Sequence, residues 1–361
     1  MPLEFAERIR RIPVYPVASG YDLGSEVAML ASNETCFSPF PAVLEAAGAA
    51  LAGAHRYPDP SYATLRRALS DRYGVPAERI ALGNGSCDIL LAAGEALLEP
   101  GAEVVYAWPA FSVYPHLAAA SGARAIEVPL DADHRHDLEA MAAEVTVATR
   151  LALICNPNNP TSTSVGLDAV EAFLERVPPH VCVILDEAYC EFSLALGDPY
   201  ASVELLRRYP NLVLLRTFSK VYGLAGLRAG YALCHAPEFR TAVDQVRQPF
   251  YLNAGAQAAA VEALRWQDDV DRRVERTLAL RSGLEDGVRA LGLWVAEADA
   301  NFIWLLLPDG AVEADVVSGL RERGVLVRAG TSLGHEGALR VTVGTDPENE
   351  RFVAALGELI R

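Results

Sequence analysis

Short apolar runs alternate with helical patterns through the middle of the chain. The runs are rich in Val, Ile and Leu and are nearly continuous, which is typical of strands covered on both faces of a parallel sheet. Strand and helix repeated in this way predict an α/β, doubly wound domain with a mostly parallel sheet. The expected strands cover residues 103–107, 124–128, 151–155, 181–185, 212–216 and 230–234.

Helical spacing of apolar residues precedes these strands and returns after them. Helices are expected over 41–54 and over 61–73, the latter with Ser61 as its N-cap. From about residue 254 a long helical region extends to about 291, followed by strand-like pieces and a last helix. These later elements are expected at 301–307, 325–328, 339–343 and 349–360.

The change of pattern near residue 254 predicts three parts. They are an N-terminal arm (1–32), a large α/β domain (33–253) and a small C-terminal α+β domain (254–361). The start of the second range is also compatible with the small domain. A length of 361 residues fits two domains of ordinary size.

Composition and charge exclude several classes of protein. The chain is 51% hydrophobic and 22% charged, and 31 basic against 47 acidic residues give a net charge of −16. This balance lacks the basic surface of a nucleic-acid or anionic-membrane binder. No apolar run is long enough for a membrane span, and residues 1–17 lack an apolar signal core, so we expect a cytoplasmic protein. The six scattered cysteines are expected to be free thiols, and no metal site is expected.

Chemically active side chains follow several of the expected strands. Asn159 lies soon after the strand 151–155, Asp186 follows 181–185, and Lys220 comes after 212–216. A Gly-Asn-Gly-Ser loop at 83–86 lies between a short strand and a helix. Ligands of open α/β sheets bind at the carboxyl ends of the strands. A lysine, a carboxylate, an amide and a helix N-terminus together suit pyridoxal 5′-phosphate, whose phosphate a helix N-terminus can bind.

The segment 217–230 (Thr-Phe-Ser-Lys-Val-Tyr-Gly-Leu-Ala-Gly-Leu-Arg-Ala-Gly) resembles the lysine segment of the fold-type-I aminotransferases. The resemblance is closest to the histidinol-phosphate aminotransferase family, near its aromatic (phenylalanine) branch. Further matching segments occur in family order at 30–34, 56–59, 155–161, 186–189 and 339–344.

The resemblance implies a role for each matching residue. Lys220 corresponds to the lysine that forms the Schiff base, Asp186 to the partner of the pyridinium nitrogen, and Tyr189 to a ligand of the ring hydroxyl. The other expected cofactor-binding residues are Gly85, Ser86, Phe111, Asn159, Thr217, Ser219, Arg228 and Tyr57 of the partner subunit. The expected substrate-binding residues are Tyr15, Asn33, Arg328 and Arg340. The role of Tyr57 implies a homodimer with shared active sites.

The implied reaction transfers an amino group from L-histidinol phosphate to 2-oxoglutarate, giving imidazole acetol phosphate and L-glutamate in histidine biosynthesis. Ser162, Cys87 and the Thr35-Cys36-Phe37 segment depart from the family pattern and leave the donor open. An aromatic amino acid such as phenylalanine is the alternative donor. Decarboxylation of a phosphorylated amino acid and non-catalytic binding are the other readings, although Lys220 and Asp186 are both present.

Overall fold

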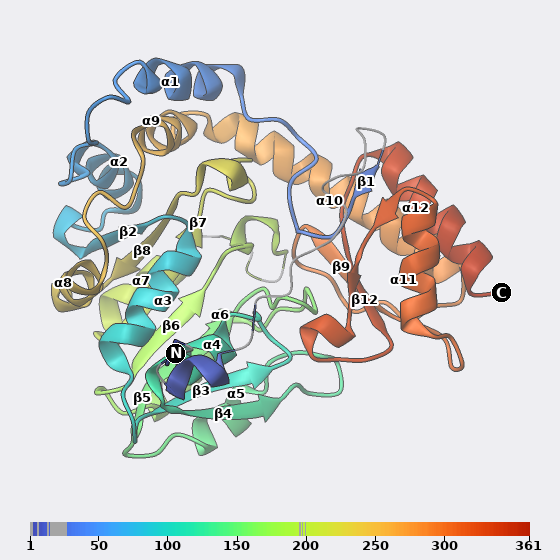
Figure 1. Ribbon diagram of the computed structural model, residues 1–361, viewed down its shortest axis with the longest axis horizontal. Coiled ribbons are helices and arrows are strands. Elements are labelled where there is room, and N and C mark those ends of the chain that lie inside the picture. Colours follow the sequence, from blue (N-terminus) through green and yellow to red (C-terminus); the bar gives the residue numbers. More distant parts are fainter. Residues whose placement is uncertain are drawn as a thin grey trace.

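A mixed, mostly parallel sheet forms the centre of the larger part of the molecule (Figure 1). The computed structural model describes residues 3–5, 7–12, 14, 27–194, 196, 198 and 200–361. The strands of this sheet are β2 (Ile80–Gly83), β3 (Glu103–Trp108), β4 (Arg124–Pro129), β5 (Thr149–Cys155), β6 (Cys182–Asp186), β7 (Leu212–Thr217) and β8 (Gly230–Cys234). Within the described residues their order is β2-β8-β7-β6-β5-β3-β4.

All the expected strands form, but two differ from the prediction. β8 is antiparallel to both β2 and β7. The reason lies in the connection from β7 to β8, whose only helix is the single 3₁₀ turn η4 (Ala225–Leu227), whereas a parallel return normally needs a full crossover helix. β4 lies at the sheet edge, and only Val128 in it is buried. A position at the edge therefore explains why β4 is not covered on both faces.

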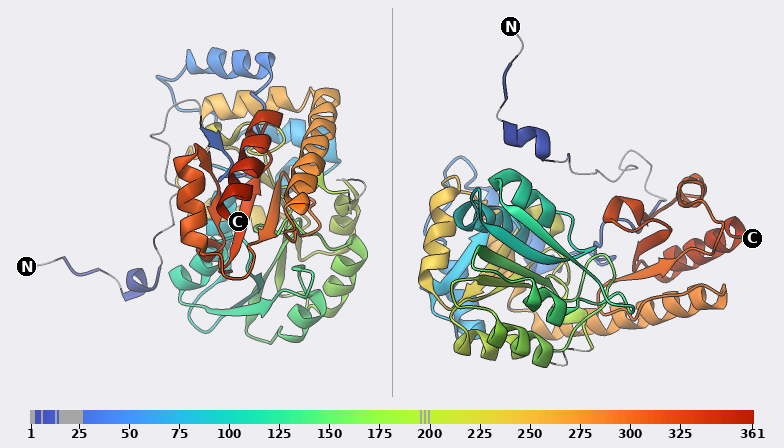
Figure 2. Two further views of the ribbon diagram at one scale, coloured as in Figure 1. Left: turned by 90° about the vertical axis from the view of Figure 1, so that its right-hand side faces the viewer. Right: turned by 90° about the horizontal axis from the view of Figure 1, so that it is seen from below.

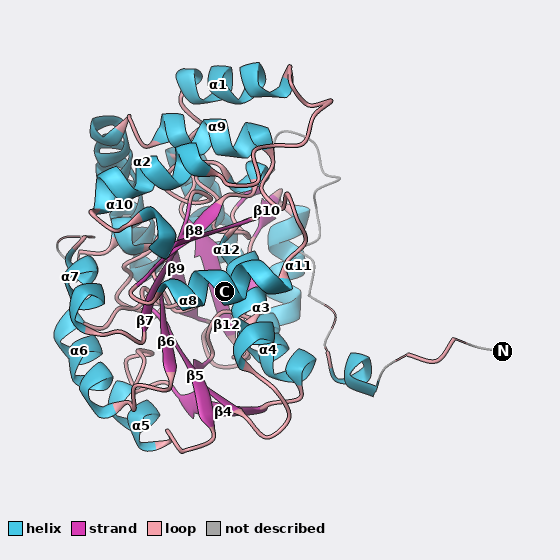
Figure 3. Cartoon of the chain, turned by 90° about the vertical axis from the view of Figure 1, so that its left-hand side faces the viewer, coloured by secondary structure: helices cyan, strands magenta, loops and turns pink. Residues whose placement is uncertain are grey.

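Helices cover both faces of the large sheet (Figure 3). The helices packed on one face are α2 (Ala63–Tyr73), α5 (Leu138–Ala143), α6 (Leu167–Arg176) and α7 (Ala201–Arg208), with α1 (Pro41–Leu51) and α9 (Ala254–Ala263) continuing that core. The helices on the other face are α3 (Ser86–Leu97), α4 (Tyr114–Ser121) and α8 (Pro237–Val246). Successive residues of β6 alternate between the two cores, so Ile184 faces α3 and α4 while Leu185 faces the opposite layer.

The start of α2 corrects the expected N-cap. The helix begins at Ala63 after Tyr62, whose backbone is left-handed (φ 51°). The carboxylate of Asp59, rather than the hydroxyl of Ser61, accepts the N–H groups of Ser61 (2.9 Å) and Ala63 (3.3 Å). A carboxylate is favoured there by the helix dipole, and the Ser61 hydroxyl itself donates to Asp59.

A smaller antiparallel sheet lies in the C-terminal part, in the order β11-β12-β9. Its strands are β9 (Phe302–Leu306), β11 (Arg328–Ala329) and β12 (Ala338–Thr342). The helices beside it are α10 (Gln267–Ala290), α11 (Glu313–Glu322) and α12 (Asp346–Leu359). Helix α10 contacts η3 (Cys190–Phe192) beside the large sheet as well as β9, and Figure 2 shows it extending beneath the C-terminal helices.

The C-terminal elements refine the expected ones. The single helical region expected from 254 to 291 is two helices, α9 and α10, separated at residues 264–266. The strand expected at 325–328 is divided into β10 (Val325–Leu326) and β11, which belong to different sheets. Helix α12 begins at Asp346, three residues earlier than expected, where Thr345 and Glu348 form a capping box.

Residues of the N-terminal arm contact both the C-terminal part of the fold and a helix of the large sheet. β1 (Ala28–Met29) pairs in parallel with β10, and η1 (Glu7–Arg11) contacts α4. The division into domains at residues 33 and 254 stays a prediction.

Among the described residues, no helix combines the length and apolar character that crossing a membrane requires.

Candidate active site

A cavity of about 310 Å³ lies at the carboxyl ends of β5, β6 and β7. It gathers most of the expected cofactor residues, which come from separate strand ends, as the open α/β architecture requires. The expected residues that line it are Ser86, Phe111, Asn159, Asp186, Tyr189, Thr217, Ser219, Lys220 and Arg228. The other lining residues are Ser32, Glu34, Cys87, Cys155, Ala188, Ala225 and Gly226.

Lys220 reaches into this cavity from the loop after β7. Its Nζ donates to the carbonyl oxygens of Asn33 (2.9 Å) and Ser32 (3.3 Å), and it lies 5.4 Å from the ring centre of Tyr189. Burial, and then the positive charge of Arg340, lower the pKa of Lys220 to about 7. The amine can therefore lose its proton near neutral pH, as a nucleophile or general base must.

The lowered pKa predicts a stability effect in the cofactor-free protein. Between pH 7 and 10 the unfolded chain keeps the Lys220 proton that the folded chain has lost, so stability rises with pH by up to about 1.4 kcal/mol per unit. Lys220→Met removes this titration. Urea unfolding at pH 7.5 and 9.5 should therefore show the variant more stable than wild type at the lower pH, with a smaller difference at the higher pH. Parallel pH profiles would contradict the assignment.

Asp186 ends β6 and is 3% exposed. Tyr114, in the first turn of α4, donates its hydroxyl to Oδ2 (3.1 Å), and the Ala188 N–H donates to Oδ1 (3.3 Å). Burial raises the pKa of Asp186 to about 6, and the hydrogen bond from Tyr114 opposes that rise. A buried carboxylate at such a position is suited to a cationic N–H group of a ligand, because that charge would favour its ionised form.

Tyr114 is a site residue that the sequence analysis did not find. The signal available was an aromatic residue three positions after Phe111, at the start of a helix. The two rings meet edge to face at 5.9 Å, so Tyr114 supports Phe111 as well as Asp186.

A hydrogen-bonded chain joins the small sheet to Tyr189. Arg340 of β12 donates from Nη1 to Asn159 Oδ1 (2.6 Å) and from Nη2 to the carbonyl of Ala31 (2.6 Å). Asn159 and Asn33 then donate their amide groups to the Tyr189 hydroxyl, at 3.5 and 3.1 Å. Burial raises the pKa of the Tyr189 hydroxyl above its ordinary value. The phenol therefore stays protonated and can donate a hydrogen bond.

Asn33 has a left-handed backbone (φ 54°), which asparagine tolerates better than most residues. Its N–H donates to the hydroxyl of Thr342 (2.9 Å), and its carbonyl accepts from Asn301 (3.2 Å) as well as from Lys220. The segment around Asn33 therefore connects both sheets at the cavity.

The turn at residues 83–86 leads from β2 into α3. Gly85 has a φ of 84°, and a Cβ atom there would collide with the guanidinium of Arg228. A Cβ atom on Gly230 would likewise collide with the Ser86 N–H nitrogen. Ser86 lines the cavity, whereas Gly85 does not, and the Gly85 N–H donates to the carbonyl of Gly83 (2.8 Å). Ser86 is therefore the residue of this turn that is best placed to bind an anion.

Two hydroxyl groups and the guanidinium of Arg228 lie close to this turn. The Thr217 hydroxyl donates to Ser219 Oγ (2.9 Å), and Arg228 Nη1 approaches the same oxygen (3.4 Å). A helix N-terminus, two hydroxyls and a guanidinium are suited to a phosphate. With Lys220 and the buried Asp186 in the same cavity, this set of donors and acceptors fits pyridoxal phosphate.

The remaining expected residues lie in different places. Arg328 of β11 is directly opposite Arg340 of β12 and is also buried. Tyr57 is 81% exposed and stacks on Phe250 at 4.5 Å, so it does not line the cavity of its own chain. Tyr15 lies outside the described residues.

No cluster of three or more His, Cys, Asp or Glu residues that could hold a metal ion occurs in the described ranges. The six cysteines are free thiols.

Comparison with known proteins agrees with this fold and site. The family described as aminotransferase class I and II matches residues 25–356. An aromatic amino acid aminotransferase of Rhodococcus opacus is 43% identical over 90% of this chain and 88% of its own length. Histidinol-phosphate aminotransferase 2 of Ralstonia nicotianae is 44% identical over 95% and 92%. The crystal structure of histidinol-phosphate aminotransferase from Sinorhizobium meliloti in complex with pyridoxal-5′-phosphate has a TM-score of 0.87 at 30% identity, covering 99% of this chain and 97% of that one.

The chain belongs to the class I and II aminotransferases and has the fold-type-I architecture. It is a pyridoxal-phosphate-dependent enzyme that transfers amino groups between amino and 2-oxo acid substrates.

Proposed function

We propose that the enzyme transfers the amino group of L-histidinol phosphate to 2-oxoglutarate. The observation that carries this proposal is the pair of buried arginines, Arg328 and Arg340, on neighbouring strands. Side chains of directly opposite residues on antiparallel strands lie on the same face of the sheet. The two guanidinium groups therefore lie on one side of the small sheet. A phosphate dianion, like the two carboxylates of 2-oxoglutarate, suits such a pair.

The residues of this chain would have the following roles in the reaction. When bound, pyridoxal phosphate supplies the aldehyde that takes up the amino group and the ring that accepts electrons. Lys220, about half of which is neutral at pH 7, would take the proton from the substrate Cα and would then give it up to the carbon that takes up the nitrogen. Asp186 keeps a proton on the ring nitrogen, and Tyr189 with Asn159 holds the ring oxygen.

Two further contacts would orient the reactants. Phe111 packs against the cofactor ring, and Ser86, Ser219 and Arg228 bind its phosphate. Arg340 binds an anionic group of either substrate, so the donor and the acceptor use the site in turn, as expected of ping-pong chemistry.

An aromatic amino acid is the second candidate donor. Relatives at similar identity carry either name, for example 43% for the aromatic enzyme and 44% for the histidinol-phosphate enzyme. Trp108 and Phe111 both pack against the apolar core on one face of the large sheet, and Phe111 lines the cavity, which also suits an aromatic side chain.

Single-turnover half-reactions would separate the two donors. The pyridoxal-phosphate-loaded enzyme is mixed with L-histidinol phosphate or with L-phenylalanine, and conversion of the cofactor to its amine form is followed by absorbance. We expect the apparent second-order rate to favour histidinol phosphate by about a hundredfold, or about 2.7 kcal/mol. The reverse ratio would assign the aromatic function.

The same assay carries its own controls. Lys220→Ala should not convert the cofactor to its amine form with either amine. If neither amine converts the wild-type cofactor, release of carbon dioxide from phosphorylated amino acids becomes the reaction to test, since a decarboxylase could use the same lysine and aspartate.

We also propose a homodimer with shared active sites. Tyr57 is exposed, stacks on the half-buried Phe250 and does not line its own cavity, and Tyr57 of the partner subunit would complete the phosphate site. The cytoplasmic location stays a prediction.

Mixing two inactive variants tests the shared site. Lys220→Ala and Tyr57→Ala each damage the site, but a hybrid dimer of the two contains one site with both residues intact. Refolding an equal mixture should therefore restore activity well above the sum of the two variants kept apart. Activity equal to that sum would exclude sharing through Tyr57.

A further inference from the structure

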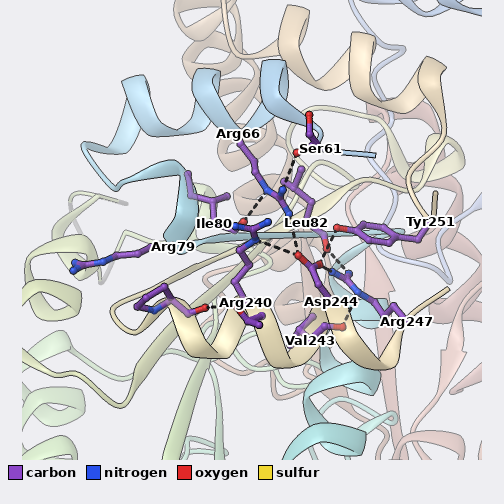
Figure 4. A network of polar contacts seen from close by, with 12 residues as sticks. Ser61, Arg66, Arg79, Ile80, Leu82, Arg240, Val243, Asp244, Arg247 and Tyr251 are labelled. Carbon is purple, nitrogen blue, oxygen red and sulfur yellow. Dashed lines mark hydrogen bonds and ion pairs between the residues drawn. The ribbon is translucent and has the colours of Figure 1, made fainter. Parts of the chain in front are cut away.

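A network of arginines covers the free edge of β2, the strand that leads into the turn at residues 83–86 (Figure 4). β2 is the first strand of its sheet and pairs with β8 on one side only. On this edge, Arg66 donates from Nε to the carbonyl of Ile80 (3.2 Å), and Arg247 donates from Nη1 to the carbonyl of Leu82. Arginine side chains thus take the place of a neighbouring strand along this edge.

Asp244 of α8 holds these arginines together. Its carboxylate accepts from Arg66 (3.2 Å), from Arg247 Nη2 (2.7 Å) and from Arg240 (3.1 Å). The Arg247 side chain is 4% exposed, and its guanidinium lies 3.8 Å from the ring centre of Tyr251. A buried guanidinium fixed in this way has little rotational freedom, so it can hold other groups in place.

Arg247 also reaches across the turn to α3. Its Nη1 bonds to Asp88 Oδ2 (3.1 Å), and the same carboxylate oxygen accepts the N–H of Asn84 (3.0 Å). One guanidinium therefore connects the last residues of β2 to the first turn of α3, and through Asp88 it also connects to the middle of the turn. The residues between these anchors include Ser86, which lines the cofactor cavity.

We propose that Arg247 is a positioning residue for the cofactor phosphate. It clamps both ends of the turn that presents Ser86, and it balances the charge of Asp88, a carboxylate that would otherwise repel a phosphate at the same helix N-terminus. Arg247 does not line the cavity and acts through the turn. The inference rests on the proposed placement of the phosphate beside Ser86.

Cofactor binding without turnover tests this role. The cofactor-free protein is titrated calorimetrically with pyridoxamine 5′-phosphate and with pyridoxamine, neither of which carries an aldehyde for Lys220. The dissociation constant of pyridoxamine divided by that of pyridoxamine 5′-phosphate measures what the phosphate contributes to binding. Arg247→Met should lower this ratio by about tenfold, which is about 1.4 kcal/mol. Pyridoxamine itself should bind as it does to the wild type.

Arg240→Met is the matched control, because Arg240 also bonds to Asp244, but within the described part of the chain no hydrogen bond or ion pair joins its side chain to the turn. Its ratio should stay within about twofold of wild type. Asp88→Asn weakens the clamp but also removes the charge that Arg247 balances, and it keeps an oxygen for Asn84, so it should lower the ratio less than Arg247→Met does. The double variant Asp88→Asn/Arg247→Met should lose less than the product of the two single losses.

The outcomes separate the inference from the function on which it rests. If Arg228→Met lowers the ratio while Arg247→Met leaves it unchanged, the phosphate is placed correctly and the positioning role is wrong. If Arg228→Met has no effect either, the phosphate does not bind beside Ser86 and the inference fails with that placement. An equal loss of affinity for both amines would show a general structural role and would also overturn it.

Discussion

Lys220→Ala is expected to abolish transamination, with a loss of about 10⁴-fold or more. The variant removes the buried amine whose pKa is lowered to about 7 and leaves no other amine among the residues that line the cavity. The carbonyl of Asn33 still has Asn301 as a donor, so the local backbone keeps a partner and the protein should fold.

Amino transfer from the preferred donor to 2-oxoglutarate is the measurement, with thermal unfolding as the check on folding. Lys220→Arg is the matched control, because it keeps a positive charge but cannot lose its proton. It should be as inactive as the alanine variant. Turnover at the wild-type rate in either variant would remove Lys220 from the mechanism.

Asp186→Asn should lower turnover by about 10²- to 10³-fold while the protein still binds its cofactor. The amide keeps the size of the carboxylate and an oxygen that can accept from Tyr114, but it cannot balance a proton on the ring nitrogen. The effect should therefore appear in kcat more than in the dissociation constant of pyridoxamine 5′-phosphate.

Tyr114→Phe is the control for this variant. It removes the 3.1 Å hydrogen bond to Asp186 but leaves the negative charge, so we expect a much smaller loss of rate. It should also raise the pKa of Asp186, because that bond opposes the effect of burial. Equal losses in the two variants would point to distortion of β6 rather than to the charge of Asp186.

The sequence predicted the strands of the large sheet well because their burial is nearly uniform. β5, β6 and β7 coincide with the expected apolar runs to within about two residues. The same reasoning overestimated the burial of β4, since its position at the sheet edge depends on strand order, which periodicity does not encode. The break at residues 264–266 was also missed, because apolar spacing continues across it.

For the site, the resemblance indicated residues that the structure gathers in one cavity. The resemblance did not indicate which distant segments contact each other. The bond from Tyr114 to Asp186 joins residues 72 positions apart, and the bond from Asn33 to Thr342 joins residues 309 apart. Arg247 gave no signal either, since an arginine after a helix is usually a solvated charge.

The charge of Arg340 would couple the binding of an anion at the proposed site to a proton on Lys220. After burial, Arg340 is the largest cause of the low pKa of Lys220 in the cofactor-free protein. An anion that neutralises Arg340 must raise that pKa, and by thermodynamic reciprocity a protonated Lys220 must hold the anion more tightly. Anion affinity should therefore fall as the pH rises through 7, so that each anion bound near neutrality brings with it a fraction of a proton.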